Sequence, residues 1–152
     1  MKHFTSKSAA ETRNLGKRLG RILHGGDIIA LCGELGSGKT VLVKGIAEGL
    51  GVKSNKDINS PSFAILKEYK GRLPLYHFDI YRLNGVATFS NVGYIEYFYG
   101  KGVSVIEWAD KIIDILPKEF LRIDLSIEEE SKRRIRIIPY GKRYRELLGK
   151  LN

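Results

Sequence analysis

One stretch in the first third of the sequence constrains the fold more than any other. It begins with a short apolar run, Asp27–Cys32, and continues directly into a glycine-rich segment, Gly33–Thr40. The next segment, Val41–Leu50, has apolar residues at helical spacing and is closed by Gly51. A short continuous apolar run is typical of a strand buried on both faces. The sequence therefore predicts a strand, a tight loop and a helix in immediate succession.

The glycine-rich segment meets the pattern G-x-x-x-x-G-K-[S/T] with Gly33, Gly38, Lys39 and Thr40. Glycines let backbone N–H groups turn inward around a phosphate, since they have no Cβ to collide with its oxygens. Lys39 can reach the β- and γ-phosphates, and the Thr40 hydroxyl can face Mg²⁺. The helix that follows points its positive end at the same place. This pattern in this context predicts a site for a nucleoside triphosphate with Mg²⁺.

Two acidic residues stand where apolar strands are expected to end. Asp79 follows residues 75–78, and Glu107 follows residues 103–106. Ligands of open α/β sheets bind at the carboxyl ends of strands. We therefore expect both carboxylates to serve the metal side of the site and hydrolysis, although Asp79 also fits a turn residue or a partner of Arg82. Asp27 and Asp110 fit local structural roles better.

The rest of the chain predicts an α/β fold with a mixed, largely parallel sheet in three layers. A capping box, Ser8-x-x-Glu11, begins a first helix. Further helices are expected in 83–102, over 109–116 and from residue 142. Strands are expected at 62–69 and 73–81, which form a hairpin, and at 103–106, 121–127 and 134–139. We find no repeat or linker, so the sequence predicts a single domain over residues 1–152.

Composition narrows the partners and the compartment. The sequence has no signal-like N-terminal apolar stretch and no run near the roughly 18 apolar residues of a membrane span. Its single cysteine, Cys32, cannot form an internal disulfide, so a cytoplasmic protein is expected. The net charge of +9 indicates a polyanionic partner such as RNA, an acidic protein surface, or simply a solubilising surface.

Four segments together resemble the bacterial TsaE family, formerly called YjeE. They are Gly33–Thr40, Ser60–Phe63, Tyr76–Leu83 (Y-H-F-D-I-Y-R-L) and Ile106–Ala109 (I-E-W-A), in the family's order and spacing. The family loop usually reads S-P-T-F/Y, and here Ser62 replaces the threonine but keeps a hydroxyl. The resemblance implies a P-loop NTPase fold and a small, weak Mg²⁺-dependent ATPase of tRNA threonylcarbamoyladenosine (t6A) synthesis. It further implies a regulatory role beside the TsaD–TsaB transferase pair, with tRNA contacted indirectly or weakly.

The resemblance also implies roles for individual residues. Thr40 and Glu107, with Asp79, should hold Mg²⁺, and Asp79, Glu107 and Lys39 should support hydrolysis. Trp108 should lie beside the nucleotide, although a core tryptophan is equally consistent with the sequence. The residues expected to contact ATP are Ser8, Gly33, Glu34, Gly36, Ser37, Gly38, Lys39, Thr40, Val41, Ser62, Trp108 and Arg133.

Other functions share the same loop. A small-molecule or nucleoside kinase would use it too, with the basic segment 132–136 as a lid. A GTPase would carry N-K-x-D, but Asn55-Lys56-Asp57-Ile58 places its aspartate one residue early. A nucleotide-gated binding module overlaps with the accessory ATPase, since slow turnover can act mainly by changing partner affinity. His77 is expected to pack or hydrogen-bond rather than to act as a base.

Overall fold

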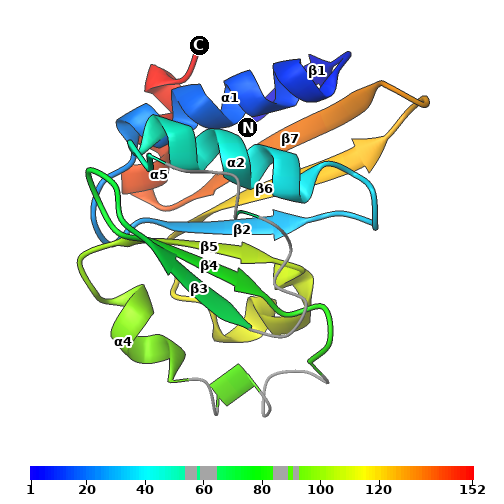
Figure 1. The fold of residues 1–152 in the computed structure, drawn as a ribbon. Coiled ribbons are helices and arrows are strands. Elements are labelled where there is room, and N and C mark those ends of the chain that lie inside the picture. The colour runs from blue at the N-terminus through cyan, green and yellow to red at the C-terminus, as the bar shows by residue number, and fades with distance from the viewer. Residues whose placement is uncertain (54–57, 59–64, 84–88, 91–92) are drawn as a thin grey trace.

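The computed structural model describes residues 1–53, 58, 65–83, 89–90 and 93–152 of the chain. Figure 1 shows a central sheet with helices on both of its faces. The elements are β1 (Lys2–Ser6), α1 (Ala9–Ile22), β2 (Ile28–Cys32), α2 (Lys39–Gly49), β3 (Leu66–Tyr69), β4 (Leu75–Asp79), α4 (Tyr94–Phe98), β5 (Val103–Glu107), the 3₁₀ helix η1 (Ala109–Ile115), β6 (Phe120–Ile127), β7 (Arg133–Tyr140) and α5 (Lys142–Lys150).

The seven strands form one mixed sheet in the order β1-β7-β6-β2-β5-β4-β3. The four central strands, β6, β2, β5 and β4, are parallel to one another. The outer strands β3, β7 and β1 each pair antiparallel with their neighbour. The predicted α/β class, the mixed sheet and the hairpin of β3 and β4 are therefore confirmed. The carboxyl ends of β2, β4 and β5 lie at one edge of the sheet, where ligands are expected.

Buried side chains alternate between two cores on opposite faces of the sheet. In β2, Ile29 and Leu31 pack toward α1 and α2, whereas Ile28, Ala30 and Cys32 pack toward η1 and α4. Every residue of β2 is buried, which explains the continuous apolar run in the sequence. Burial also raises the pKa of the Cys32 thiol to about 11, so this free thiol stays protonated at neutral pH.

Helices α1 and α2 cross closely because glycines stand at their contact. A Cβ atom added at Gly16 or Gly20 of α1 would collide with the backbone of α2. A Cβ atom added at Gly45 or Gly49 of α2 would collide with the backbone of α1. Each pair is spaced by four residues, which places its two glycines on the same side of their helix. The crossing fixes where the amino-terminal end of α1 lies.

Some elements differ from the sequence-based predictions. Strand β1 was not predicted, because Lys2–Ser6 contains a single large apolar residue, Phe4, which packs at the sheet edge beside β7. The helix expected over 109–116 is a 3₁₀ helix with a non-helical residue, Ile112. In the capping box, Ser8 accepts from Glu11 N–H as predicted, but Glu11 accepts from Lys7 N–H, one residue before the cap.

The remaining predicted helices agree with the structure. Helix α2 begins at Lys39 and ends at Gly49, two residues before and one residue short of the predicted stretch Val41–Leu50. Helix α4 is the short helix expected within 83–102, and α5 is the predicted carboxyl-terminal helix. None of the described helices has both the length and the apolar character needed to cross a membrane.

The glycine crossing gives a first prediction. Gly45→Ala should lower the free energy of unfolding by about 1–3 kcal/mol, since its methyl group would overlap the Arg13 carbonyl of α1. Gly149→Ala in α5 is the matched control, because a Cβ there meets no atom within 4 Å, and it should stabilise by about 0.5–1 kcal/mol. Urea unfolding would measure both. Equal stability of Gly45→Ala and wild type would contradict the close crossing.

Candidate functional site

The phosphate loop connects the end of β2 to the start of α2 at the carboxyl edge of the parallel strands. Gly38, the residue before α2, has φ of +104°, a conformation that favours glycine. Gly33 has no room for a side chain, because a Cβ would lie 2.6 Å from the Leu125 carbonyl oxygen and 2.7 Å from Ser37 Oγ. The loop therefore needs its two motif glycines for different reasons, one for conformation and one for close approach. The amino-terminal end of α2, where this loop leads into the helix, suits an anion.

Lys39 is buried at the base of this loop. Its Nζ donates to the carbonyl oxygens of Gly33 at 2.5 Å and Glu34 at 2.9 Å, and it lies 3.9 Å from the centre of the Trp108 ring. Burial lowers the pKa of the Lys39 ammonium below its ordinary value, while the carboxylates of Glu107 and Asp79 oppose this shift. The sequence analysis placed Lys39 and Trp108 at one site, and the structure brings them together.

A chain of three side chains joins the loop to the strand beside it. Thr40 Oγ1 donates to Glu107 Oε1 at 3.1 Å, and His77 Nε2 donates to Glu107 Oε2 at 2.5 Å. His77 and Glu107 are 0 % and 1 % exposed. The His77 Nδ1 atom has no hydrogen-bond partner among the described residues, so Glu107 is the ring's one polar contact there. This agrees with the expected hydrogen-bonding role of His77, but its partner is Glu107 rather than the neighbouring Asp79.

Asp79 stands opposite Glu107 on the adjacent parallel strand, in register with it. Its Oδ1 accepts from the Tyr81 backbone N–H at 3.1 Å, and its side chain is only half-buried. The sequence left two roles open for Asp79, a turn residue and an acid at a strand end. The structure shows Asp79 in both positions. Asp27 pairs with Arg143 at the start of β2, and the exposed Asp110 lies in the first turn of η1, so both occupy the expected structural positions.

Trp108 follows Glu107 directly and adopts a strained backbone conformation. Its φ of +64° is the one positive value among the described residues other than glycine. Its ring packs against that of Tyr81, with centroids 4.8 Å apart, and also contacts Lys39 Nζ. Backbone strain of this kind costs on the order of 1–3 kcal/mol and is concentrated at functional sites. The half-buried Trp108 thus lies beside Lys39 as well as in the second core.

A pocket of about 300 Å³ lies beside the loop, between the start of α1 and the connection from β6 to β7. Five residues predicted to contact the nucleotide line it: Ser8, Gly36, Gly38, Val41 and Arg133. The sequence analysis did not predict Ala9, Glu130 and Ser131, which also line it. These residues carry no motif, and only their approach in space to the phosphate loop reveals them.

Arg133 closes this pocket over the phosphate loop. One of its Nη atoms donates to the Gly36 carbonyl at 3.1 Å, and the other donates to backbone carbonyls of the β6–β7 connection, including Glu129 at 2.9 Å. Among the other predicted residues, Ser37 is buried with its hydroxyl 3.5 Å from Lys39 Nζ, and Glu34 is exposed. The predicted contact Ser62 lies outside the described residues.

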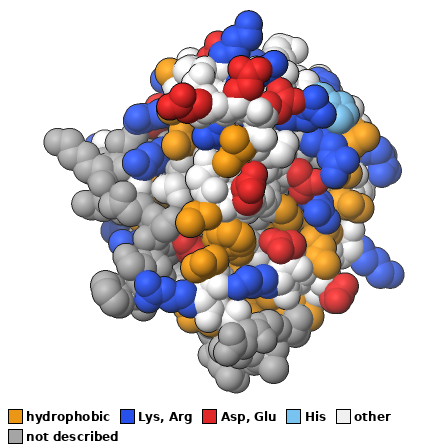
Figure 2. Space-filling model, turned by 90° about the vertical axis from the view of Figure 1, so that its right-hand side faces the viewer, with side chains coloured by type: hydrophobic (Ala, Val, Ile, Leu, Met, Phe, Trp, Pro, Cys, Tyr) orange, Lys and Arg blue, Asp and Glu red, His pale blue; other side chains and the backbone are white. Residues whose placement is uncertain are grey.

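Oxygen atoms of Thr40 and Glu107 suit the hard cation Mg²⁺, which proteins bind with one or two carboxylates and substrate phosphates. A threonine hydroxyl that donates to a carboxylate still has lone pairs for a metal. Figure 2 shows the side toward which the arrowheads of β2, β4 and β5 point in Figure 1, and acidic and basic side chains are mixed there around hydrophobic ones. The positive charge of the sequence is therefore not gathered into one patch on this side.

The parallel strands, the glycine loop between β2 and α2, and the acid-ended strand β5 define a P-loop protein of the α/β class. A family model described as "Threonylcarbamoyl adenosine biosynthesis protein TsaE" matches residues 6–135. The chain therefore belongs to the TsaE family, and the resemblance found in its sequence is confirmed.

Individual relatives support this assignment. A TsaE protein of Treponema pallidum is 42 % identical over 132 residues, which are 87 % of this chain and 96 % of the relative. A TsaE protein of Bacillus subtilis is 41 % identical over 143 residues, covering 93 % and 88 % of the two chains. The crystal structure of Bacillus subtilis YdiB superposes with a TM-score of 0.82 at 37 % identity, covering 99 % of this chain and 93 % of that one.

The buried pair of His77 and Glu107 gives a second prediction. His77→Phe should lower the free energy of unfolding by about 3–5 kcal/mol, because Glu107 would stay buried with one oxygen unpaired. Combining it with Glu107→Leu should cost clearly less than the sum of the single changes. His3→Phe, on the exposed side of β1, is the control and should change stability by less than about 0.5 kcal/mol. Additive losses in the double variant would rule out the proposed coupling.

Proposed function

We propose that this chain binds ATP with Mg²⁺, hydrolyses it slowly, and supports threonylcarbamoylation of the adenosine beside the anticodon of tRNA. The observation that carries the proposal is the Thr40–Glu107 hydrogen bond, which joins the end of the phosphate loop to a buried carboxylate at the next strand. A loop that merely connected a strand to a helix would not need a buried acid at this point. Family membership supplies the biological setting, since the relatives are named for t6A biosynthesis.

Each group has a distinct part in binding the phosphates. The Lys39 ammonium exchanges its bonds to the Gly33 and Glu34 carbonyls for the β- and γ-phosphate oxygens, which carry full negative charge. Thr40 and Glu107 would hold Mg²⁺, and the bound ion would supply positive charge beside the phosphates. His77 keeps the Glu107 carboxylate oriented, since it holds the oxygen that Thr40 does not.

The nucleoside and the attacking water occupy opposite sides of the loop. The pocket lined by Ser8, Val41 and Arg133 receives the nucleoside, and Arg133 holds the loop through the Gly36 carbonyl. Asp79, in register with Glu107, orients water at the γ-phosphate. Asp79 also contacts the Tyr81 N–H, so it is not dedicated to water, which fits a slow hydrolase.

The accessory role follows from this slow turnover. We infer that the chain works in the cytoplasm with the TsaD–TsaB transferase and regulates or resets that pair, and that tRNA touches this chain indirectly or weakly. A nucleoside kinase would need an acceptor site beside the γ-phosphate. Phosphate transfer to nucleosides or sugars instead of water would favour that alternative.

The third prediction concerns turnover. Lys39→Ala should lower ATP hydrolysis by about 100-fold or more, because the charge that meets the β- and γ-phosphates is removed. Lys44→Ala, which removes a half-buried lysine further along the same helix, is the matched control and should change turnover less than twofold. Phosphate release is measured alone and with TsaD, TsaB and tRNA. Equal turnover of Lys39→Ala and wild type would contradict the ATPase.

Two further measurements separate the parts of this proposal. Mg-ATP should raise the unfolding temperature more than Mg-GTP at equal concentration, because only a bound nucleotide stabilises the fold.

Extract depleted of its own TsaE should regain t6A when wild-type chain is added, and not when Glu107→Ala is added. If Glu107→Ala restored t6A, the conclusion that the chain binds the nucleotide would still stand. The proposal that t6A synthesis needs hydrolysis by this chain would then be contradicted.

A further inference from the structure

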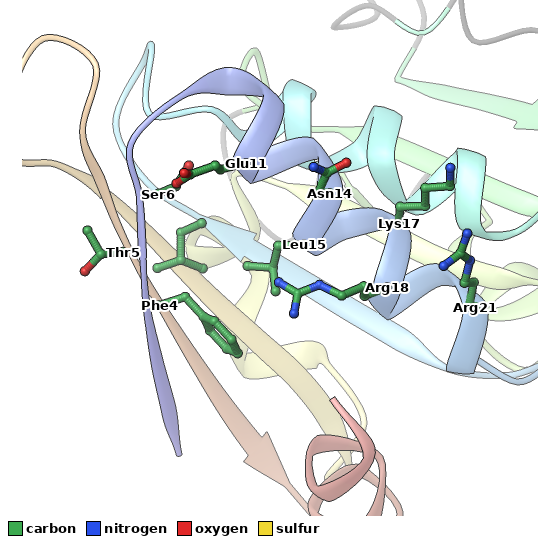
Figure 3. A pocket seen from close by; sticks show the side chains of 10 residues that line it. Phe4, Thr5, Ser6, Glu11, Asn14, Leu15, Lys17, Arg18 and Arg21 are labelled. Atoms are coloured by element: carbon green, nitrogen blue, oxygen red, sulfur yellow. The ribbon is translucent and has the colours of Figure 1, made fainter. Parts of the chain in front are cut away.

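A groove separate from the nucleotide pocket lies between β1 and α1, with a volume of about 560 Å³. Figure 3 shows it from close by, with Phe4 projecting from β1 and Leu15 from α1 toward the same space. Ser6, the last residue of β1, lines the groove at the end where β1 leads into α1. None of the residues that form the phosphate loop lines it. The groove is therefore a site distinct from the phosphate loop.

The floor of the groove is apolar. Leu15 is 3 % exposed, Ile135 is 0 % exposed, and the half-buried Phe4 packs against the same core. These side chains come from α1, β7 and β1, so the floor forms only when the edge of the sheet is assembled against the helix. An apolar floor in a concave site is typical of binding sites rather than of a merely solvated surface.

The wall on α1 is basic. Lys17, Arg18 and Arg21 line the groove, and none of the three forms an ion pair with any residue that the structure describes. The lining has a single carboxylate, that of Glu11, against these three cations. The groove therefore has an excess of positive charge above its apolar floor.

One acidic residue, Glu11, also lines the groove, but its carboxylate has a structural task. Its Oε2 accepts from the Lys7 backbone N–H at 2.7 Å at the start of α1. The exposed side-chain amide of Asn14 lies between Glu11 and the three cations in the helix sequence. Positive charge and hydrogen-bond donors thus lie along the helix, and apolar surface lies beneath them.

We propose that this groove binds a segment of a partner protein that carries carboxylate and apolar side chains together. Its carboxylates pair with Lys17, Arg18 and Arg21, and its apolar side chains cover the half-buried ring of Phe4. A nucleic acid backbone fits less well, because phosphates have no apolar surface to bury against this floor. The volume admits a few side chains, so a short segment suffices.

The test uses the full-length chain and a fluorescein-labelled ten-residue peptide of glutamates interspersed with leucines. Fluorescence anisotropy should show saturable binding to wild type. Arg18→Glu with Arg21→Glu should weaken it at least about tenfold, since two attractions become repulsions. Phe4→Ser should weaken it about as much through the floor. Lys142→Glu with Arg145→Glu makes the same change of charge on the exposed side of α5 and should change binding less than twofold.

Comparison ligands decide the class of partner. A decaglutamate of the same length should bind at least about tenfold more weakly than the mixed peptide, because it cannot use the floor. Equal binding of decaglutamate, no binding of the mixed peptide, or an equal loss in the α5 control would overturn the proposal. So would a ten-nucleotide RNA that binds more tightly than the mixed peptide and is lost in the Arg18/Arg21 variant. Thermal unfolding of every variant verifies that it is folded. If Phe4→Ser does not fold, the variant with Arg18→Glu and Arg21→Glu, which changes only surface side chains, still tests the proposal.

Discussion

The close crossing of α1 over α2 determines how both candidate sites are built. Glycines at the contact bring the two backbones together, so no side chain adjusts the distance between the helices. Since α2 begins at the phosphate loop, this crossing also sets the distance from the loop to the start of α1. Ser8 and Thr12 therefore reach the pocket beside the phosphate loop, and the opposite wall of α1 faces β1. A methyl group at the contact would displace one helix and disturb both places.

A second constraint is the buried carboxylate of Glu107. A buried charge is costly unless hydrogen bonds satisfy it, and here a helix residue, Thr40, and a strand residue, His77, supply those bonds from two directions. The parallel pairing of β4 with β5 places Asp79 opposite Glu107 and His77 opposite Val105. His77 and Asp79 are two residues apart on β4, so their side chains lie on the same face of the sheet. The same hydrogen bonds that stabilise the acid also aim it at the phosphate loop. Stability and the candidate chemistry therefore share one set of contacts.

The parts that the sequence predicted are those whose signal is local. The phosphate loop, the helix after it and the acids at strand ends are each readable within about ten residues, and the structure brings Lys39, Thr40, Asp79 and Glu107 together. Strand β1 was missed because its pairing with β7 joins residues more than a hundred positions apart. The hydrogen bond from His77 to Glu107 depends on strand register. Ala9 and Ser131 line the same pocket only because the tertiary fold brings the start of α1 close to the β6–β7 connection.

The two candidate sites meet where β1 ends and α1 begins. Ser6, the last residue of β1, lines the groove, and its hydroxyl shares a buried 2.7 Å hydrogen bond with Thr12, which lines the pocket beside the phosphate loop. Two ligands influence each other only if each favours a different arrangement of something they share. The glycines at the crossing hold the backbones of α1 and α2 in close contact, which opposes a movement of α1 as a whole. The hydroxyl pair of Ser6 and Thr12 is the contact that joins the groove to the pocket directly.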